Sequence, residues 1–255
     1  MTPIVELKKV TKVFGGLAAV KNVDIAVNQN EIFGIIGPNG AGKTTIFNMI
    51  TGLFAPTEGD ILFQGKSIVG LKPYNIAQAG IARTFQNIKL FNNLTVLQNI
   101  LTVAQHQANY NFFDSLLRTP KFRKQDAELF RFSEKILEEA GVAQFSNFRA
   151  SNLPYGSQRR VEIARALALS PKVLLLDEPA AGMNEDETAK MARLINELRD
   201  KFNLTVIIID HHMDLIMELC HRIAVLNFGE LIALGNPDEV QKDPKVVEAY
   251  LGVDE

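Results

Sequence analysis

Residues 37–44 read GPNGAGKT and match the pattern G-x-x-x-x-G-K-[ST], whose residue types together can bind phosphate. The three glycines let the backbone curl so that successive N–H groups face an anion. Lys43 adds a positive charge that can reach the outer phosphates of a nucleotide, and Thr44 adds a hydroxyl suited to Mg²⁺. The spacing therefore predicts a nucleotide site, and a glycine-rich structural turn is the alternative.

A pair of carboxylates, Asp177 and Glu178, follows directly after the apolar run VLLL at 173–176. Such a run is typical of a central strand, and ligands of open α/β sheets bind at the carboxyl ends of strands. We expect Asp177 to hold Mg²⁺, directly or through water. Glu178 is then the candidate general base, or the group that orients the attacking water. Two solvated carboxylates in a turn are the alternative.

A third stretch, LPYGSQRR at 153–160, places Gly156 just before an apolar-periodic segment that starts at Val161. The free N–H groups at a helix start attract an anion. We expect Ser157 either to cap this helix or to turn its hydroxyl toward a phosphate. The stretch does not by itself identify a ligand, and an ordinary capped helix is the alternative.

Strands and helices must position these three stretches, and the pattern of apolar residues predicts where they lie. Strands are expected at 4–10, 20–27, 31–36, 60–66, 173–176, 205–209, 222–226 and 230–235. Helices are expected at 43–50, at about 186–201 and from about 213. Residues 72–170 have a helical pattern in which Leu94, Leu97, Leu101 and Ala104 share one face. Apolar strands that alternate with helices predict an α/β fold with a parallel sheet covered on both faces.

Composition limits the possible classes of protein. The chain has 255 residues, is 47% hydrophobic and carries a net charge of −2, with a pI near 6.1. A nucleic-acid-binding protein would more often be basic, so we expect no nucleic acid partner. The single cysteine, Cys220, is expected in the core, and no disulfide can form within one chain. The start of the chain lacks the apolar stretch of a signal peptide, and no apolar run approaches the length of a membrane span.

Taken in order, GPNGAGKTT, LPYGSQRR and VLLLDEP resemble the motifs of an ATP-binding cassette (ABC) ATPase subunit. The resemblance implies a P-loop NTPase core with a mostly parallel sheet, an antiparallel β subdomain and a helical subdomain that carries the signature motif. The whole chain, 1–255, would be one ABC ATPase domain, with the core at about 1–85 and 171–255 and the helical subdomain at about 86–170. The residues implied to bind ATP are Phe14, Gly37, Pro38, Asn39, Gly40, Ala41, Gly42, Lys43, Thr44 and Thr45.

The same resemblance assigns roles to single residues, several of which would mean little alone. Gln86, in ARTFQN, would contact Mg²⁺ or the attacking water, although a lone glutamine is usually a surface residue. His211 would sense the γ-phosphate and His212 stands where the family usually has aspartate; alone, each would be a structural histidine. Phe14 would stack on adenine, but alone would be a core residue. The implied catalytic residues are Glu178, His211 and Gln86, and the implied Mg²⁺ ligands are Thr44, Gln86 and Asp177.

In the resembling family the signature faces the ATP held by a second subunit. Here Gly156, Ser157 and Gln158 would act in that way, across an interface. Two residues depart from the family pattern, because Pro154 replaces a serine and Ser157 replaces a glutamine. Pro154 lacks both the hydroxyl and a backbone N–H, which raises the alternative of a subunit that binds ATP but hydrolyses it poorly.

The segments ARTFQNIKLFNNLTVLQNI and AAGMN resemble the ATPases of branched-chain amino acid uptake, in particular the larger of the two paired subunits. This resemblance implies an importer at the cytoplasmic face of the cell (inner) membrane. Its partners would be transmembrane permease subunits docked near Leu90 and Phe91, a second ATP-binding subunit (a paralogue or a copy), and indirectly a periplasmic or extracellular binding protein. The alternatives are the ATPase of another ABC transporter, such as a lipopolysaccharide exporter, and a soluble nucleotide-gated interaction protein.

Residues 105–140 are expected to form a long, charged, mostly helical stretch. Its first part carries apolar and basic residues side by side, namely Phe112, Phe113, Leu116, Leu117, Arg118, Lys121, Arg123 and Lys124. One interpretation is an amphipathic hairpin packed on its own domain with a solvated basic face. The other is a surface close to anionic lipid or to the membrane partner.

Overall fold

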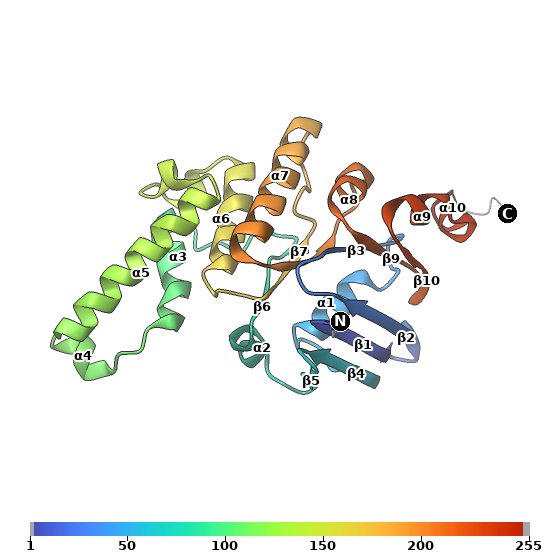
Figure 1. The fold of residues 1–255 in the computed structure, drawn as a ribbon, viewed down its shortest axis with the longest axis horizontal. Coiled ribbons are helices and arrows are strands. Elements are labelled where there is room, and N and C mark those ends of the chain that lie inside the picture. Colours follow the sequence, from blue (N-terminus) through green and yellow to red (C-terminus); the bar gives the residue numbers. More distant parts are fainter. Residues whose placement is uncertain (1–2, 252–255) are drawn as a thin grey trace. The chain divides into compact units, whose positions relative to one another are not determined.

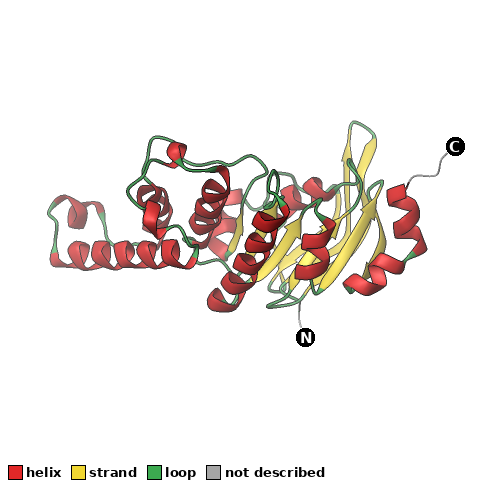
Figure 2. Ribbon diagram, turned by 90° about the horizontal axis from the view of Figure 1, so that it is seen from above, coloured by secondary structure: helices red, strands yellow, loops and turns green. Residues whose placement is uncertain are grey.

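The computed structural model describes residues 3–251. The chain forms two compact units, each described here by itself. The first, called the core unit, comprises Met1–Gln86 and Lys172–Glu255, and the second, called the helical unit, comprises Asn87–Pro171. Strands occur in the core unit, and the described part of the helical unit is built from helices and their connections (Figure 2).

The core unit contains a six-stranded sheet in the order β10-β9-β3-β8-β7-β6. All neighbouring pairs are parallel except β9 and β10, which are antiparallel. Every residue of β3, β7 and β8 is buried, as expected for central strands covered on both faces. The bounds are β3 Ile32–Ile36, β6 Ile81–Arg83, β7 Val173–Asp177, β8 Thr205–Ile209, β9 Arg222–Asn227 and β10 Glu230–Gly235.

A second sheet is antiparallel and has the order β2-β1-β4-β5 (Figure 1). It shares a hydrophobic core with the first sheet. Phe33 and Ile35 of β3 belong to this core, together with Val5 and Leu7 of β1 and with Phe47 of α1. Alternation along β3 therefore sends every second side chain toward the antiparallel sheet and α1. The bounds are β1 Val5–Phe14, β2 Leu17–Val27, β4 Glu58–Phe63 and β5 Lys66–Ser67.

The core unit contains six described helices. The bounds are α1 Lys43–Ile50, α2 Pro73–Ala79, α7 Glu185–Phe202, α8 Met213–Leu219, α9 Pro237–Lys242 and α10 Pro244–Leu251. Helix α7 begins with a capping box between Asn184 and Glu187 and ends at Asn203 in the left-handed conformation. Local sequence thus fixes where this helix begins and ends.

The helical unit has its own small core. Its α-helices are α3 Val96–Ala104, α4 Phe112–Leu116, α5 Pro120–Glu139 and α6 Tyr155–Leu167, with 3₁₀ turns at Gln105–Gln107, Ala143–Phe145 and Ala150–Asn152. The buried residues include Ile100 of α3, Ile136 and Leu137 of α5, and Val161 and Ala164 of α6. Contacts between these three helices therefore hold the unit together.

The structure confirms the α/β fold class, the mostly parallel sheet, the antiparallel sheet and the helical subdomain. Cys220 is buried, and burial raises the pKa of its thiol, which agrees with the core position expected for it. No helix among residues 3–251 is both long and apolar enough to cross a membrane.

Two local predictions were wrong. Ile81–Arg83 forms strand β6 inside a segment expected to be helical, because three residues at a sheet edge carry too short a pattern to detect. On α3 the buried face is formed by Val96, Asn99, Ile100 and Ala104, whereas Leu97 and Leu101, placed on the predicted face, are only half-buried.

Candidate nucleotide-binding and catalytic site

The loop between β3 and α1 requires glycine at two positions. Gly37 has φ 146°, and a Cβ there would lie 2.0 Å from the carbonyl oxygen of Leu226. Gly42 has φ 101°, and a Cβ there would lie 2.4 Å from the carbonyl oxygen of Ala19. The backbone therefore presses against neighbouring strands while it curls, a geometry that side chains would prevent.

Helix α1 starts at this loop without a side-chain cap, since its N-cap residue is Gly42. Within residues 3–251, the N–H groups of Lys43, Thr44 and Thr45 have no acceptor. Such groups, together with the helix dipole, bind phosphate. The cradle therefore fits the triphosphate of a nucleotide, and the exposed Thr44 stands at its edge.

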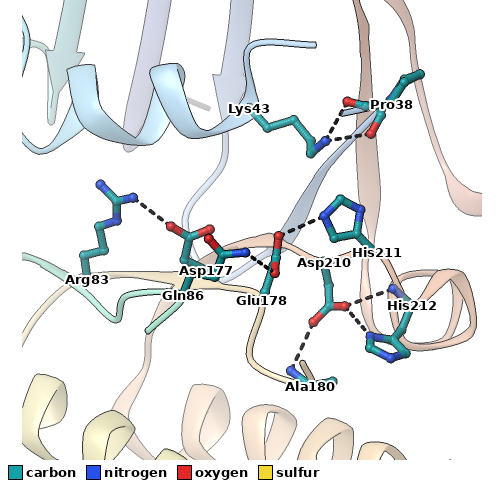
Figure 3. A network of polar contacts seen from close by, with 11 residues as sticks. Pro38, Lys43, Arg83, Gln86, Asp177, Glu178, Ala180, Asp210, His211 and His212 are labelled. Carbon is teal, nitrogen blue, oxygen red and sulfur yellow. Dashed lines mark hydrogen bonds and ion pairs between the residues drawn. The ribbon is translucent and has the colours of Figure 1, made fainter. Parts of the chain in front are cut away.

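Lys43 lies buried over the same loop. Its ammonium donates hydrogen bonds to the carbonyl oxygens of Gly37, at 2.7 Å, and Pro38, at 2.9 Å (Figure 3). Burial lowers the pKa of Lys43, and the charges of Glu178 and Asp177 partly oppose this shift. A phosphate beside the ammonium would supply the counter-charge that burial otherwise makes necessary.

Asp177, at the carboxyl end of β7, is held by a buried ion pair. Its Oδ2 lies 2.7 Å from Nη2 of Arg83, and both side chains are almost fully buried. Arg83 also donates to Oδ1 of Asn48 in α1, at 2.7 Å. One guanidinium thus joins the end of β6, the end of β7 and α1. The sequence analysis missed Arg83, and its only signal was a cation three residues before Gln86.

Glu178 lies between the two other predicted catalytic residues, Gln86 and His211. Its Oε2 accepts a hydrogen bond from Nε2 of Gln86, at 2.8 Å, and its Oε1 lies 2.8 Å from Nε2 of His211 (Figure 3). Gln86 follows β6, Glu178 follows β7 and His211 follows β8. The structure therefore brings these three residues together because the carboxyl ends of neighbouring parallel strands share one edge.

The backbone of Glu178 is strained. Its φ of 49° lies in the left-handed region, which costs on the order of 1–3 kcal/mol for a non-glycine residue. A hydrogen bond from its N–H to the carbonyl oxygen of Ile209, at 2.7 Å, holds this conformation. The turn therefore aims the Glu178 carboxylate away from the direction that a continuing strand would give it.

Asp210 is a second site residue that the sequence analysis missed. It is buried, and its carboxylate accepts hydrogen bonds from the backbone N–H of Ala180, at 3.1 Å, and of His212, at 2.9 Å. The ring Nδ1 of His212 also lies 2.7 Å from Asp210. The two histidines therefore face different carboxylates, and only His211 faces Glu178 (Figure 3). A carboxylate directly after the apolar strand β8 was the available signal.

The oxygen donors near the loop fit Mg²⁺ bound together with a nucleotide. Thr44 offers a hydroxyl, Asp177 a carboxylate and Gln86 the oxygen of the side-chain amide whose Nε2 bonds to Glu178. Within residues 3–251, no cluster of three histidine, cysteine or acidic side chains could hold a metal alone. Because Mg²⁺ typically takes one or two protein ligands along with phosphate oxygens and water, this donor set suits it.

Phe14 is not a core residue. Taken without the family resemblance, its sequence position had suggested the core. Its side chain is 42% exposed and meets Phe54 edge-to-face, with ring centroids 5.3 Å apart. The ammonium of Lys12 lies 5.1 Å from the Phe14 ring centroid. An exposed ring held in place by a second aromatic side chain can stack on a flat base.

The last described helix, α10, also contacts the phosphate loop. Burial raises the pKa of the Tyr250 hydroxyl, and the nearby backbone of Gly37 partly opposes this shift. Lys245 and Glu248 of the same helix line a cavity of about 810 Å³ together with residues 38–41 of the loop. The sequence offered no signal for this contact, since more than two hundred residues separate its two sides.

In the stretch LPYGSQRR, residues 153–160, helix α6 does not start at the residue expected to cap it. The N-cap of α6 is Pro154, with φ −56° and ψ 150°, and Ser157 is the third residue of the helix, so Ser157 does not cap it. Proline fixes its own φ and suits the residue before a helix start. The amide of Gln158 instead bonds back to Leu153, at 2.9 Å, and a Cβ on Gly156 would meet nothing within 4 Å.

Buried charges anchor α6 behind this open corner. Arg159 is fully buried and pairs with Glu162 at 2.8 Å, and Tyr155 accepts from the same guanidinium at 3.2 Å. Glu162 also accepts from the backbone N–H of Lys89, at 3.3 Å. The helix start is therefore fixed in position although its first turn is open.

The fold and site define a P-loop nucleotide-binding cassette. The family model described as "ABC transporter" matches residues 20–181, and "Branched-chain amino acid ATP-binding cassette transporter" matches residues 230–255. This chain belongs to the ABC transporter family, as an ATP-hydrolysing cassette.

Relatives and solved structures agree with this membership. The high-affinity branched-chain amino acid transport ATP-binding protein BraF of Pseudomonas aeruginosa is 44% identical over 98% of each chain. The lipopolysaccharide export system ATP-binding protein LptB of Haemophilus influenzae is 35% identical over 98% of this chain and 97% of its own. The ADP conformation of MJ1267, an ATP-binding cassette of an ABC transporter, has a TM-score of 0.85 and 33% identity, covering 99% of this chain and 100% of its own. The dimeric cassette MJ0796 has a TM-score of 0.77 and 27% identity, covering 91% and 98%.

Proposed function

We propose that this chain is the ATP-binding and ATP-hydrolysing subunit of an importer for branched-chain amino acids. The observation that carries the hydrolytic part is the Glu178 carboxylate, held by Gln86 and His211 beside the phosphate loop. The substrate class is supported by the 44% identity to BraF and by the match of residues 230–255 to a branched-chain amino acid cassette model.

In this proposal the first-turn amides of α1 and Lys43 bind the phosphates of ATP, and Phe14 stacks on its base. Mg²⁺, held by Thr44 and Asp177 with help from Gln86, would neutralise charge on the transferring phosphoryl group. Glu178 orients a water for in-line attack and accepts its proton. Its strained turn and its two hydrogen-bonding neighbours keep the carboxylate aimed at that water.

We also propose that Gly156, Ser157 and Gln158 complete the ATP site of a second ATP-binding subunit. The first turn of α6 lacks a side-chain cap and offers N–H groups to an anion. A pair of cassettes would close on two ATP molecules and reopen after hydrolysis, which moves the permease. The dimeric cassette MJ0796 supports a paired arrangement for this fold.

The segment after Gln86 is suited to dock a permease at the cytoplasmic face of the membrane. Phe91 is exposed, while its backbone is fixed by two hydrogen bonds with the buried amide of Asn99, at 2.9 and 3.2 Å. Arg165 lies over the Phe91 ring at 5.7 Å. A fixed apolar side chain in such a place can anchor a helix of the membrane partner.

Reconstitution tests the proposal. The chain is combined with the permease subunits that copurify with it, and uptake of leucine, isoleucine or valine into proteoliposomes is measured with ATP inside or outside. We expect uptake that needs ATP on the cassette side and that Glu178→Gln abolishes. Glu218→Gln, an exposed position on α8, is the matched control and should leave uptake unchanged.

The likeness to LptB favours one rival, an exporter of lipid-linked sugars. Copurification with permeases that extrude lipopolysaccharide, with no ATP-dependent amino acid uptake, would establish the exporter. A second measurement examines docking: Phe91→Ala should weaken assembly with the permease and leave ATP affinity unchanged. Phe148→Ala, another exposed phenylalanine of the helical unit, is its control.

A further inference from the structure

The hairpin formed by α4, its connection and α5 is firmly built. For this hairpin, defined as residues 109–131, a capping box joins Asn111 and Asp114, and Thr119 caps α5 through the N–H of Phe122. Tyr110 and Phe122 pack edge-to-face, with ring centroids 4.9 Å apart. The tip of the hairpin is therefore held in a defined conformation by its own caps and ring contact.

Large apolar side chains are nevertheless exposed at this tip. Phe113, Leu116 and Leu117 are 69%, 65% and 72% exposed. Their spacing of three and four residues places them on one face of α4. The interpretation that the hairpin packs on its own domain leaves these three exposed side chains unexplained. A cluster of this kind on a soluble surface marks a site of interaction.

The same tip is basic in a chain that is acidic overall. The hairpin, residues 109–131, contains five basic side chains and three acidic side chains, a surplus of two positive charges, whereas the whole chain has a net charge of −2. Asp114 lies 3.8 Å from Lys121, and Asp126 lines the same groove as Arg118 and Arg123. The charge is therefore concentrated beside the exposed apolar face.

A groove of about 670 Å³ runs along the N-terminal half of α5. Arg118, Arg123 and Arg131 line it together with Phe122 and Phe130, and Asp126 is its one acidic residue. Guanidinium groups bind phosphate oxygens in a planar, two-point geometry. The groove thus offers donors for a phosphate group next to apolar side chains that can enter a hydrocarbon layer.

We propose that the tip of the α4–α5 hairpin binds the surface of an anionic membrane. Phe113, Leu116 and Leu117 insert at the boundary between headgroups and acyl chains, and the arginines of the groove contact lipid phosphates. A lipid surface suits these residues better than a protein partner because the apolar side chains are exposed on a short helix and its C-cap rather than in a groove. The basic surplus complements anionic lipid directly. This contact goes beyond the proposed transport function and depends on neither the permease nor the amino acid.

Vesicle flotation tests the proposal with the full chain alone. The probes are vesicles of phosphatidylcholine, and of phosphatidylcholine with about one third phosphatidylglycerol. We expect flotation with the anionic vesicles that falls as salt rises. Arg118→Gln combined with Arg123→Gln should lower the partition coefficient about 30-fold, and Leu117→Ser about tenfold. ATP hydrolysis by these variants should stay unchanged, which also shows that they fold.

Matched controls isolate the hairpin. Leu17→Ser alters a leucine of the core unit that is 74% exposed, and Lys190→Gln with Arg193→Gln removes two exposed cations from α7. Both should float like the unaltered chain. The proposal is overturned by absence of flotation, by equal flotation on neutral vesicles, or by hairpin variants that bind vesicles normally. Hairpin variants that lose the permease but keep vesicle binding would identify a protein-docking surface instead. Loss of amino acid uptake with intact flotation would fault only the proposed transport function.

Discussion

The starts of α1 and α6 are two glycine-containing corners that the chain builds in different ways. Both helices begin without a side-chain cap. At α1, Gly37 and Gly42 are pressed against the backbone of Leu226 and Ala19. At α6, the space around Gly156 is open, and buried charges behind the corner fix the helix.

Four other helices have capped starts, unlike α1 and α6. Helices α3, α4, α7 and α9 each begin with a capping box in which side chains satisfy free N–H groups. The two corners leave those groups for a ligand. The α1 corner has the candidate catalytic groups within the same unit, whereas the α6 corner has only the buried charges that anchor its helix. We infer that the first site is nearly complete within one chain and that the second needs another chain to supply its anion.

The largest expected effect concerns the claim that the α1 site holds its own catalytic group. Glu178→Gln should lower ATP hydrolysis about 10²–10⁴-fold, because the amide cannot accept the proton of the attacking water. ATP binding should remain, since the phosphate cradle is untouched. Phosphate release measures hydrolysis, and nucleotide titration measures ATP binding. Hydrolysis at an unaltered rate would show that the catalytic group is another residue and would contradict the comparison of the two helix starts.

The next largest effect distinguishes the loop before α1 from the start of α6 directly. Gly37→Ala should unfold the phosphate loop and weaken ATP binding by about 100-fold, since its Cβ would lie 2.0 Å from a carbonyl oxygen at a positive φ. Gly156→Ala should leave the chain as stable as before, because no atom lies in the way. Thermal unfolding with and without ATP reports both. Equal losses of stability at the two positions would contradict the geometry described for them.

Placing a charge at the open corner sharpens the comparison further. Gly156→Asp should stabilise the free chain by about 0.3–1 kcal/mol, because an anion favours a helix start. In the assembled complex it should lower ATP turnover by at least about tenfold, because it repels the phosphate of the partner's nucleotide. ATP binding by the single chain should stay unchanged. Turnover at the normal rate in the complex would exclude this corner from the ATP site.

The lowered pKa of Lys43 gives a dependence on pH. Burial depresses this pKa below its ordinary 10.5, so between the two values the unfolded chain binds more protons and the free energy of unfolding rises with pH. ATP favours the ammonium form, so its Kd should increase with pH in the alkaline range, by up to about tenfold per pH unit. Nucleotide titrations over a pH series measure the Kd for ATP. Lys43→Arg, which stays charged, should remove the pH dependence of the Kd. A pH dependence that persists in Lys43→Arg would belong to another titrating group.

The smallest expected effect concerns the contact between α10 and the loop. Tyr250→Phe removes the hydroxyl that lies near the backbone of Gly37 and should weaken ATP binding about two- to tenfold, equivalent to about 0.5–1.5 kcal/mol. Tyr74→Phe, an exposed tyrosine of α2, is the control and should bind ATP normally. Nucleotide titration compares the two variants. Identical affinities would show that α10 does not support the loop.

The fold was largely predictable, because fully apolar strands and strong helix starts carry their signals within a few residues. The three motifs also indicated nucleotide chemistry from residue types alone. Arg83 was missed because the ion pair that buries it is formed with Asp177, 94 residues later in the chain. Asp210 was missed although it follows an apolar strand as Asp177 does, because its bond to the N–H of Ala180 is formed only in the fold. Ser157 was misassigned as a possible cap because the helix begins earlier than expected: its N-cap is Pro154, three residues before Ser157.

By itself the sequence determined the class of fold, the phosphate loop and the identity of the carboxylate beside it. These depend on local periodicity and on glycines whose backbone freedom no other residue has. Only the tertiary structure decided which histidine faces Glu178, which cation holds Asp177, and that helix α10 lies beside the phosphate loop. The reason is that parallel strands bring their ends together at one edge of the sheet, and side chains distant in sequence meet there.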